Sequence, residues 1–153
     1  MFSILFCKLP IQKFIGQELN YMNLILLAKK YSIYKFRNGS VLPGWVYTSE
    51  FYSITRTLEE ISVVALQTDF FSDDFICNKD WRIIKVAGTL DFSLVGIIAD
   101  LSSVFKKKNI SIFTISTYDT DYILVKQKDI NAGIQALTEN GHTISLEIIK
   151  ASD

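Results

Sequence analysis

The chain has 153 residues, with 16 Lys and Arg against 16 Asp and Glu, a length that suits one compact domain or two very small ones with a shared core. Apolar residues make up 49% of the chain and charged residues 21%, which excludes wholesale disorder. The formal net charge of zero disfavours a general nucleic-acid binder, because such proteins carry a basic excess.

The N-terminal residues 1–21 match no secondary-structure pattern. An apolar run opens them, but it is far shorter than the ~20 residues that span a membrane, and it lacks the features of a signal peptide. We interpret Met22 as the natural start and residues 1–21 as a non-native extension.

Two isolated cysteines, Cys7 and Cys77, are expected to be free thiols in a reducing compartment. We therefore expect a cytoplasmic protein with no membrane segment.

Residues 22–70 predict a small, degraded α+β unit. Between its second and third strands there is room for only a short helix. A polar linker is expected at residues 71–80, and a unit so short should merge its sheet with the rest of the chain. The expected strands are Leu24–Lys29, Ser32–Phe36, Phe51–Thr57 and Ile61–Gln67.

Residues 81–153 predict a complete α+β unit. An amphipathic helix is expected over Leu94–Phe105, with N-cap candidates just before it and lysines in its last turn. A second helix is expected to begin at Asp129 and to end at Asn140-Gly141. The order is βαββαβ, a ferredoxin-like fold with one antiparallel sheet and two helices on one face. The expected strands are Arg82–Ala87, Ile110–Thr117, Asp121–Lys126 and Thr143–Ile149.

The usual signatures of catalysis are missing from this sequence. No phosphate-binding loop, dinucleotide fingerprint, nucleophile elbow or zinc-protease motif appears. The sole histidine, His142, has no Cys or acidic residue at metal-ligand spacing, so we predict a structural or surface role for it. The aromatic strand signature of RNA-binding ferredoxin-like domains is also missing, and Phe113 is expected in the core. We expect no enzyme activity, no cofactor, no metal and no nucleic-acid partner.

Polar side chains crowd the turn between the two hairpin strands, residues 116–121. Ser, Thr and Asp commonly build turns, but two acids and several hydroxyls exceed what a short turn needs. A carboxylate there suits an ammonium group, whereas the amides of the helix start near Asp91 and Ser93 suit a carboxylate. Opposite charges at two ends are the pattern of an α-amino acid, so an amino-acid site is one interpretation of these residues, and an ordinary polar turn is the simpler one.

Four segments together resemble the small tandem ACT-domain proteins of bacteria, relatives of the ACT domains of the cytosolic arginine sensors. They are Gly88–Gly96, Ile110–Phe113, Ser116–Val125 and Gly141-His142. The resemblance implies two ACT units in one continuous sheet with helices on one face. It also implies that an amino acid or a similar small molecule is held between the two units.

The resemblance also implies a set of ligand-binding residues, in which Asp121 would hold an ammonium or guanidinium group. The leading hypothesis is a non-enzymatic regulatory sensor. The alternative is a ligand-free ACT interaction module, which acts through homo-oligomerisation or through an unknown protein partner. The residues carried over from the family are Ser62, Val63, Asp91, Ser93, Thr117, Tyr118 and Asp121.

Overall fold

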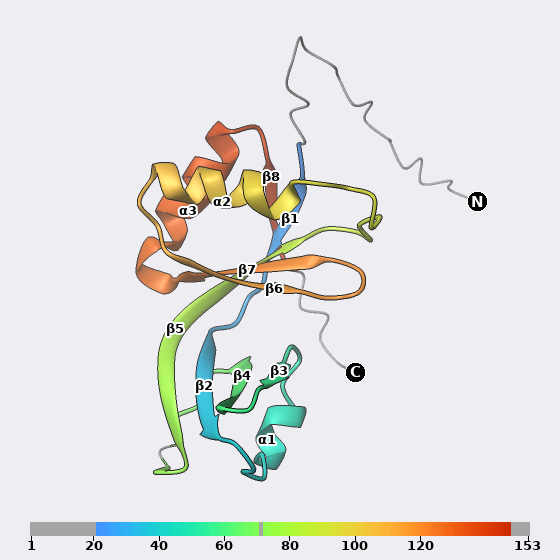
Figure 1. Ribbon diagram of the computed structural model, residues 1–153. Coiled ribbons are helices and arrows are strands. Elements are labelled where there is room, and N and C mark those ends of the chain that lie inside the picture. The colour runs from blue at the N-terminus through green and yellow to red at the C-terminus, as the bar shows by residue number, and fades with distance from the viewer. Residues whose placement is uncertain (1–20, 71, 148–153) are drawn as a thin grey trace, which may run out of the picture.

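The computed structural model describes residues 21–70 and 72–147, which form one eight-stranded sheet with few helices (Figure 1). The predicted extension at residues 1–21 lies almost wholly outside the described residues. The strands are β1 (Asn23–Leu26), β2 (Tyr31–Arg37), β3 (Ser53–Arg56), β4 (Glu60–Leu66), β5 (Phe75–Val86), β6 (Ile112–Ser116), β7 (Asp121–Lys126) and β8 (Thr143–Leu146). The helices are α1 (Gly44–Tyr47), α2 (Ile97–Lys107), the 3₁₀ turn η1 (Gln127–Asp129) and α3 (Ile130–Glu139).

The C-terminal half comprises the end of β5, α2, β6, β7, α3 and β8, and it has the predicted βαββαβ order with both helices on one face of the sheet (Figure 1). The predicted α+β fold class is confirmed. One strand was misplaced by the sequence, because β1 was expected in the first unit. In the structure β1 lies between β5 and β8, antiparallel to the former and parallel to the latter. Its side chains Leu24 and Leu26 are buried in the C-terminal core. The sequence of β1 alone does not specify which half of the chain it packs against.

The N-terminal half comprises β2, α1, β3, β4 and the start of β5. Its strands lie in the order β3-β4-β2-β5, which is the order of a ferredoxin-like unit. The short helix predicted here is confirmed, since α1 has four residues. Between β4 and β5 the described residues contain no helix. The interpretation of this half as a degraded ACT unit stays a prediction.

Strand β5 joins the two halves. It runs without interruption from Phe75 to Val86, so most of the linker predicted at residues 71–80 is strand. The polar residues in this stretch suggested a linker, but their backbone pairs with β2. Asp80 has a positive φ of 63°, and the β2–β5 register shifts close to it, between Tyr31 and Ile33. This bulge lies where β5 passes from one half to the other.

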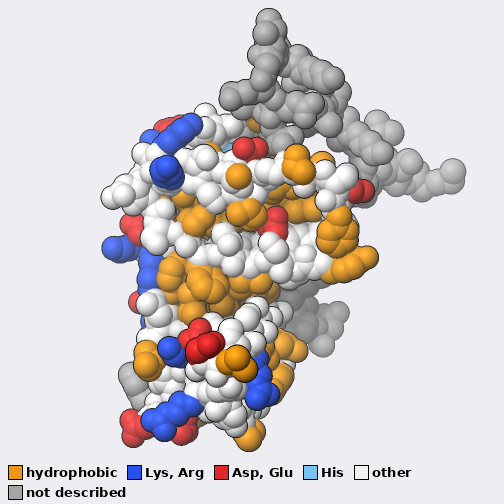
Figure 2. Space-filling model, viewed as in Figure 1, with side chains coloured by type: hydrophobic (Ala, Val, Ile, Leu, Met, Phe, Trp, Pro, Cys, Tyr) orange, Lys and Arg blue, Asp and Glu red, His pale blue; other side chains and the backbone are white. Residues whose placement is uncertain are grey.

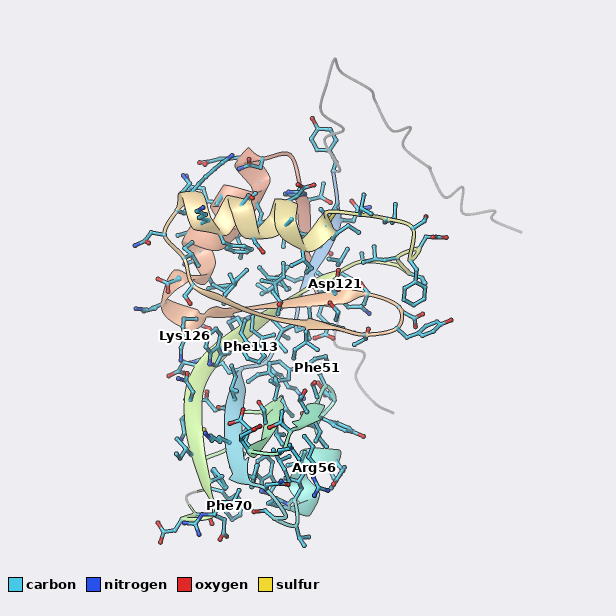
Figure 3. The ribbon with its side chains drawn as sticks, in the orientation of Figure 1. Phe51, Arg56, Phe70, Phe113, Asp121 and Lys126 are labelled. Atoms are coloured by element: carbon cyan, nitrogen blue, oxygen red, sulfur yellow. The ribbon has the colours of Figure 1, made fainter. Side chains whose placement is uncertain are left out.

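Three buried clusters form the core. One lies between the C-terminal sheet and its helices, and includes the fully buried Phe105. A second lies at the junction of the two halves and includes Tyr31 and Leu124, with Phe113 half-buried against it. Phe51 reaches the same junction, where its ring centroid is 4.6 Å from that of Tyr122 (Figure 3). The third lies between the N-terminal sheet and α1, so the two halves are packed together through the second cluster.

Helix α2 begins at Ile97, three residues later than predicted. Gly96 precedes it with a φ of 86°, a left-handed conformation that glycine adopts readily. The predicted end is confirmed, because two lysines occupy the last turn and Asn109 has a φ of 56°. The histidine also agrees with its prediction: His142 is buried, and its Nδ1 accepts a hydrogen bond from the Met22 amide at 3.3 Å.

Candidate functional site

The turn between β6 and β7 is held in shape by its own side chains. The Thr117 amide and hydroxyl both donate to the Thr120 carbonyl, each at 2.9 Å. At the base of the turn, the Ser116 hydroxyl donates to Asp121 Oδ1 at 2.5 Å. The hydroxyl-rich composition therefore builds the turn, as the simpler interpretation of the sequence proposed, and it leaves the outer part of the turn exposed.

The loop between β5 and α2 lies beside this turn. Its chain direction changes at Gly88, which has a φ of 84°. Asp91 Oδ1 then accepts a hydrogen bond from the Ser93 amide at 2.8 Å. This backbone hydrogen bond, together with one from the Ser93 side chain, holds the pKa of Asp91 below its ordinary value. At neutral pH the loop therefore carries a carboxylate.

Two hydrogen bonds fasten the turn to the start of the loop. The hydroxyl of Thr120, which is only 4% exposed, donates to the Val86 carbonyl at 2.7 Å. The Leu90 amide donates to the Asp119 carbonyl, also at 2.7 Å. The turn and the loop are thus neighbouring walls whose separation is set by these bonds.

Between these two walls and the first turn of α2 lies a pocket of about 400 Å³. Its lining consists of Leu90, Asp91, Phe92, Leu94, Gly96–Ala99 and Ser116–Asp121. Figure 2 shows acidic and apolar side chains side by side on this face of the molecule, and Figure 3 shows Asp121 at the hairpin. The volume lies within the range of small-molecule sites in proteins.

The pocket is electrostatically one-sided. Three carboxylates line it, those of Asp91, Asp119 and Asp121, and the described lining contains no Lys, Arg or His. The N-terminus of α2 contributes positive character only through backbone amides of its first turn. At the mouth, Phe92 and Tyr118 are 76% and 80% exposed, and their ring centroids are 5.1 Å apart. The arrangement can hold a small molecule that carries both a cationic group and a carboxylate.

Of the predicted binding residues, Asp91, Thr117, Tyr118 and Asp121 come together at this pocket. Ser93 is adjacent through its bond to Asp91, but it does not line the pocket. The other two predicted residues, on β4, are elsewhere: Val63 is fully buried against α1, and the neighbouring Ser62 pairs with β2 and β3. A part for these two in binding stays a prediction.

Several lining residues were not predicted as ligands, and the two with the most chemical interest are Asp119 and Phe92. Asp119 belongs to the same polar turn and was within reach of that argument. Phe92 had no signal, because an aromatic residue beside a helix start normally reads as part of the apolar face. In the structure α2 begins only at Ile97, so Phe92 remains in the loop and exposed.

Residues 21–70 and 72–147 contain neither a metal-binding cluster nor a membrane-spanning helix. No group of three or more His, Cys, Asp or Glu side chains there is arranged to hold a metal ion. No helix in this part of the chain is both long and apolar enough to cross a bilayer.

The fold and the pocket define an α+β protein of ferredoxin-like topology with a ligand-sized pocket at a strand-to-helix loop. A family model described as the ACT domain matches residues 76–139, and a model described as an N-terminal domain matches residues 29–73. A crystal structure of an Agobacterium tumefaciens protein is 30% identical, with 87% of this chain and 98% of that chain covered and a TM-score of 0.76. The part of the chain over residues 76–139 is thus an ACT domain.

Aspartate kinases share the fold at low sequence identity. The enzyme of Clostridium acetobutylicum is 12% identical, with 80% of this chain and 35% of that chain covered and a TM-score of 0.60. The regulatory subunit from Thermus thermophilus is 10% identical, with 77% and 96% covered and a TM-score of 0.55. At such identities the likeness shows the fold alone.

Proposed function

We propose that this protein is a non-catalytic regulatory protein that binds an amino acid or a similar small zwitterion in the pocket between α2 and the β6–β7 turn. The predicted tandem ACT arrangement and the kinship with the arginine sensors are part of this proposal. The observation that carries it is the pocket itself, which carboxylates of the turn and residues of the first turn of α2 line together. Asp121 would hold the ammonium group, and the amides of Ile97 and Ile98 would receive the carboxylate.

The connection of the two halves supports a regulatory role. Strand β5 begins in the N-terminal half and ends at Val86, whose carbonyl accepts the Thr120 hydroxyl. A ligand that drew the turn and the loop together would act on the end of this strand. It would change the relative position of the halves only to the extent that it binds one arrangement better than the other. The resemblance implies a ligand held between the two halves. Such a ligand would also have to contact β4, the strand that carries Ser62 and Val63.

The alternative is an interaction module without a ligand. Apolar side chains exposed on the loop favour it, since Phe92 is 76%, Leu94 54% and Val95 83% exposed. Strand β6 pairs only with β7 and leaves its other edge free among the described strands, and such an edge accepts a further strand. On this alternative the protein acts through self-association or through a protein partner.

Thermal unfolding in the presence of each free amino acid separates the two functions. A ligand at 100 times its Kd stabilises the fold by about 2.7 kcal/mol, which for a chain of this size is a shift of several degrees. The shift should disappear in Asp121→Asn and persist in Asp69→Asn, a matched change at an exposed acid away from the pocket. No shift with any amino acid at millimolar concentration, together with concentration-dependent assembly, would favour the interaction module.

A further inference from the structure

A second pocket lies at the far end of the N-terminal half and is independent of the proposed amino-acid site. It has a volume of about 510 Å³ and is lined from β2, from the start of β5, from the segment that leads into α1 and from the residues before β5. Figure 3 shows Phe70 at this end of the molecule, whereas Asp121 lies in the other half, on the β6–β7 hairpin. Neither the sequence motifs nor the proposed function accounts for this pocket.

The walls of this pocket are aromatic. Phe36, Trp45, Phe70 and Phe75 all line it. The Phe75 ring centroid is 5.2 Å from that of Phe36 and 6.2 Å from that of Trp45. Phe36 is 1% exposed and therefore fixed in the core, whereas Phe70 is 71% exposed. Three neighbouring rings thus form a firm wall, and Phe70 is a fourth ring at the open side.

The polar side of the pocket is acidic. Asp74 lines it, and the described lining contains no Lys or Arg. The Ser72 hydroxyl donates to Asp74 Oδ2 at 2.7 Å, and within the described part of the chain Asp74 makes no ion pair. Two basic groups line an adjoining hollow that shares Asp74. There Lys35 is already paired with Glu60 at 3.1 Å, and Arg37 is the remaining cation.

We propose that this pocket is a binding site for an organic cation of the alkylammonium class. The electron-rich faces of clustered aromatic rings attract such cations, and a carboxylate beside the rings adds charge attraction. The apolar walls suit alkyl groups on the nitrogen, which a bare ammonium ion lacks. A lone carboxylate on open surface would bind such a cation weakly, so the aromatic wall is what makes the site selective.

The probe for this site is choline, with 3,3-dimethylbutan-1-ol as the neutral molecule of the same shape. The readout is the NMR signal of the two tryptophan indole N–H groups in the full chain. We expect choline to shift the Trp45 signal and to leave the Trp81 signal unchanged, because Trp81 lies in the junction cluster. The neutral alcohol should bind roughly 3- to 30-fold more weakly, the range that a cation–aromatic contribution implies. The Trp81→Phe variant assigns the two signals.

Surface variants keep the test independent of folding. Asp74→Asn and Phe70→Ala change exposed side chains, and each should weaken choline binding several-fold. Asp73→Asn is the matched control, since Asp73 is also exposed and lines only the adjoining hollow. Arg37→Gln should strengthen binding, because it removes the competing cation. Equal binding of choline and the alcohol, equal effects of the two aspartate variants, or no shift of the Trp45 signal would overturn the proposal.

Discussion

Replacement of Thr120 by valine tests how the walls of the α2 pocket are held together. The Thr120 side chain is 4% exposed, and its hydroxyl donates to the Val86 carbonyl at 2.7 Å across 34 residues of chain. Valine has nearly the same shape, so the substitution removes the hydrogen bond and leaves little cavity. The Val86 carbonyl loses this donor at the point where β5 ends and the loop begins.

The expected loss of stability follows from this burial. A neutral intramolecular hydrogen bond contributes about 0.5–1.5 kcal/mol, and a buried partner left unpaired costs about 1–3 kcal/mol. The extra methyl group that valine buries offsets part of this cost. We therefore expect the free energy of unfolding to fall by about 1–2 kcal/mol, which for a chain of this length lowers Tm by roughly 2–8 °C.

Urea unfolding followed by circular dichroism measures this change, and Thr114→Val is its control. Thr114 lies on the neighbouring strand β6, is exposed, and its hydroxyl makes no hydrogen bond within the described residues. Its replacement removes the same atoms and should change stability by less than about 0.5 kcal/mol. Equal stability of the two variants would refute the reasoning, because the bond to Val86 would then not hold the turn in solution.

Three further predictions concern the core and two buried titratable groups. Phe105→Ala should destabilise the fold by about 3–5 kcal/mol in urea unfolding, because the ring is fully buried, whereas Phe92→Ala at an exposed position should cost less than about 0.5 kcal/mol. Burial lowers the pKa of His142, so its contribution to stability is complete above pH about 6.5 and is lost on acidification below it. In His142→Gln the free energy of unfolding should therefore depend less on pH across this range, and an unchanged pH dependence would contradict the prediction. Burial first, and then the charges of nearby glutamates, raise the pKa of Tyr31 to about 12, so the free energy of unfolding should fall as the pH rises from about 10 through that value. In an ultraviolet titration, Tyr31→Phe should lack one of the tyrosine ionisations that occur at high pH.

The positions of most elements followed from the sequence because local patterns carry them. A short continuous apolar run, Tyr-Ile-Leu-Val, placed β7 correctly at Asp121–Lys126. Lysines marked the last turn of α2. The start of α2 was placed too early, at Leu94, because an apolar stripe does not distinguish a helical turn from an exposed loop of the same spacing. Only the left-handed Gly96 in the structure marks where the helix begins.

The candidate site divides in the same way. The polar turn at residues 116–121 and the loop around Asp91 were each visible as local sequence features, and their meeting followed from the ferredoxin-like order. Asp119 and Phe92 became lining residues only through the path of the loop. The part played by Val63 was carried over by resemblance, and its burial against α1 was not visible in the sequence.

The sequence by itself determined the α+β class, the βαββαβ order of the C-terminal half and the polar composition of the turn, because each depends on residues that are close in the chain. Tertiary structure decided what depends on distant partners. It inserted β1 between β5 and β8, and it extended β5 through a stretch that reads as a linker. It also gathered four aromatic rings beside Asp74. Strand pairing and pocket formation depend on the burial of side chains from segments that are far apart along the chain. Local patterns in one amino-acid sequence do not specify which of these segments meet.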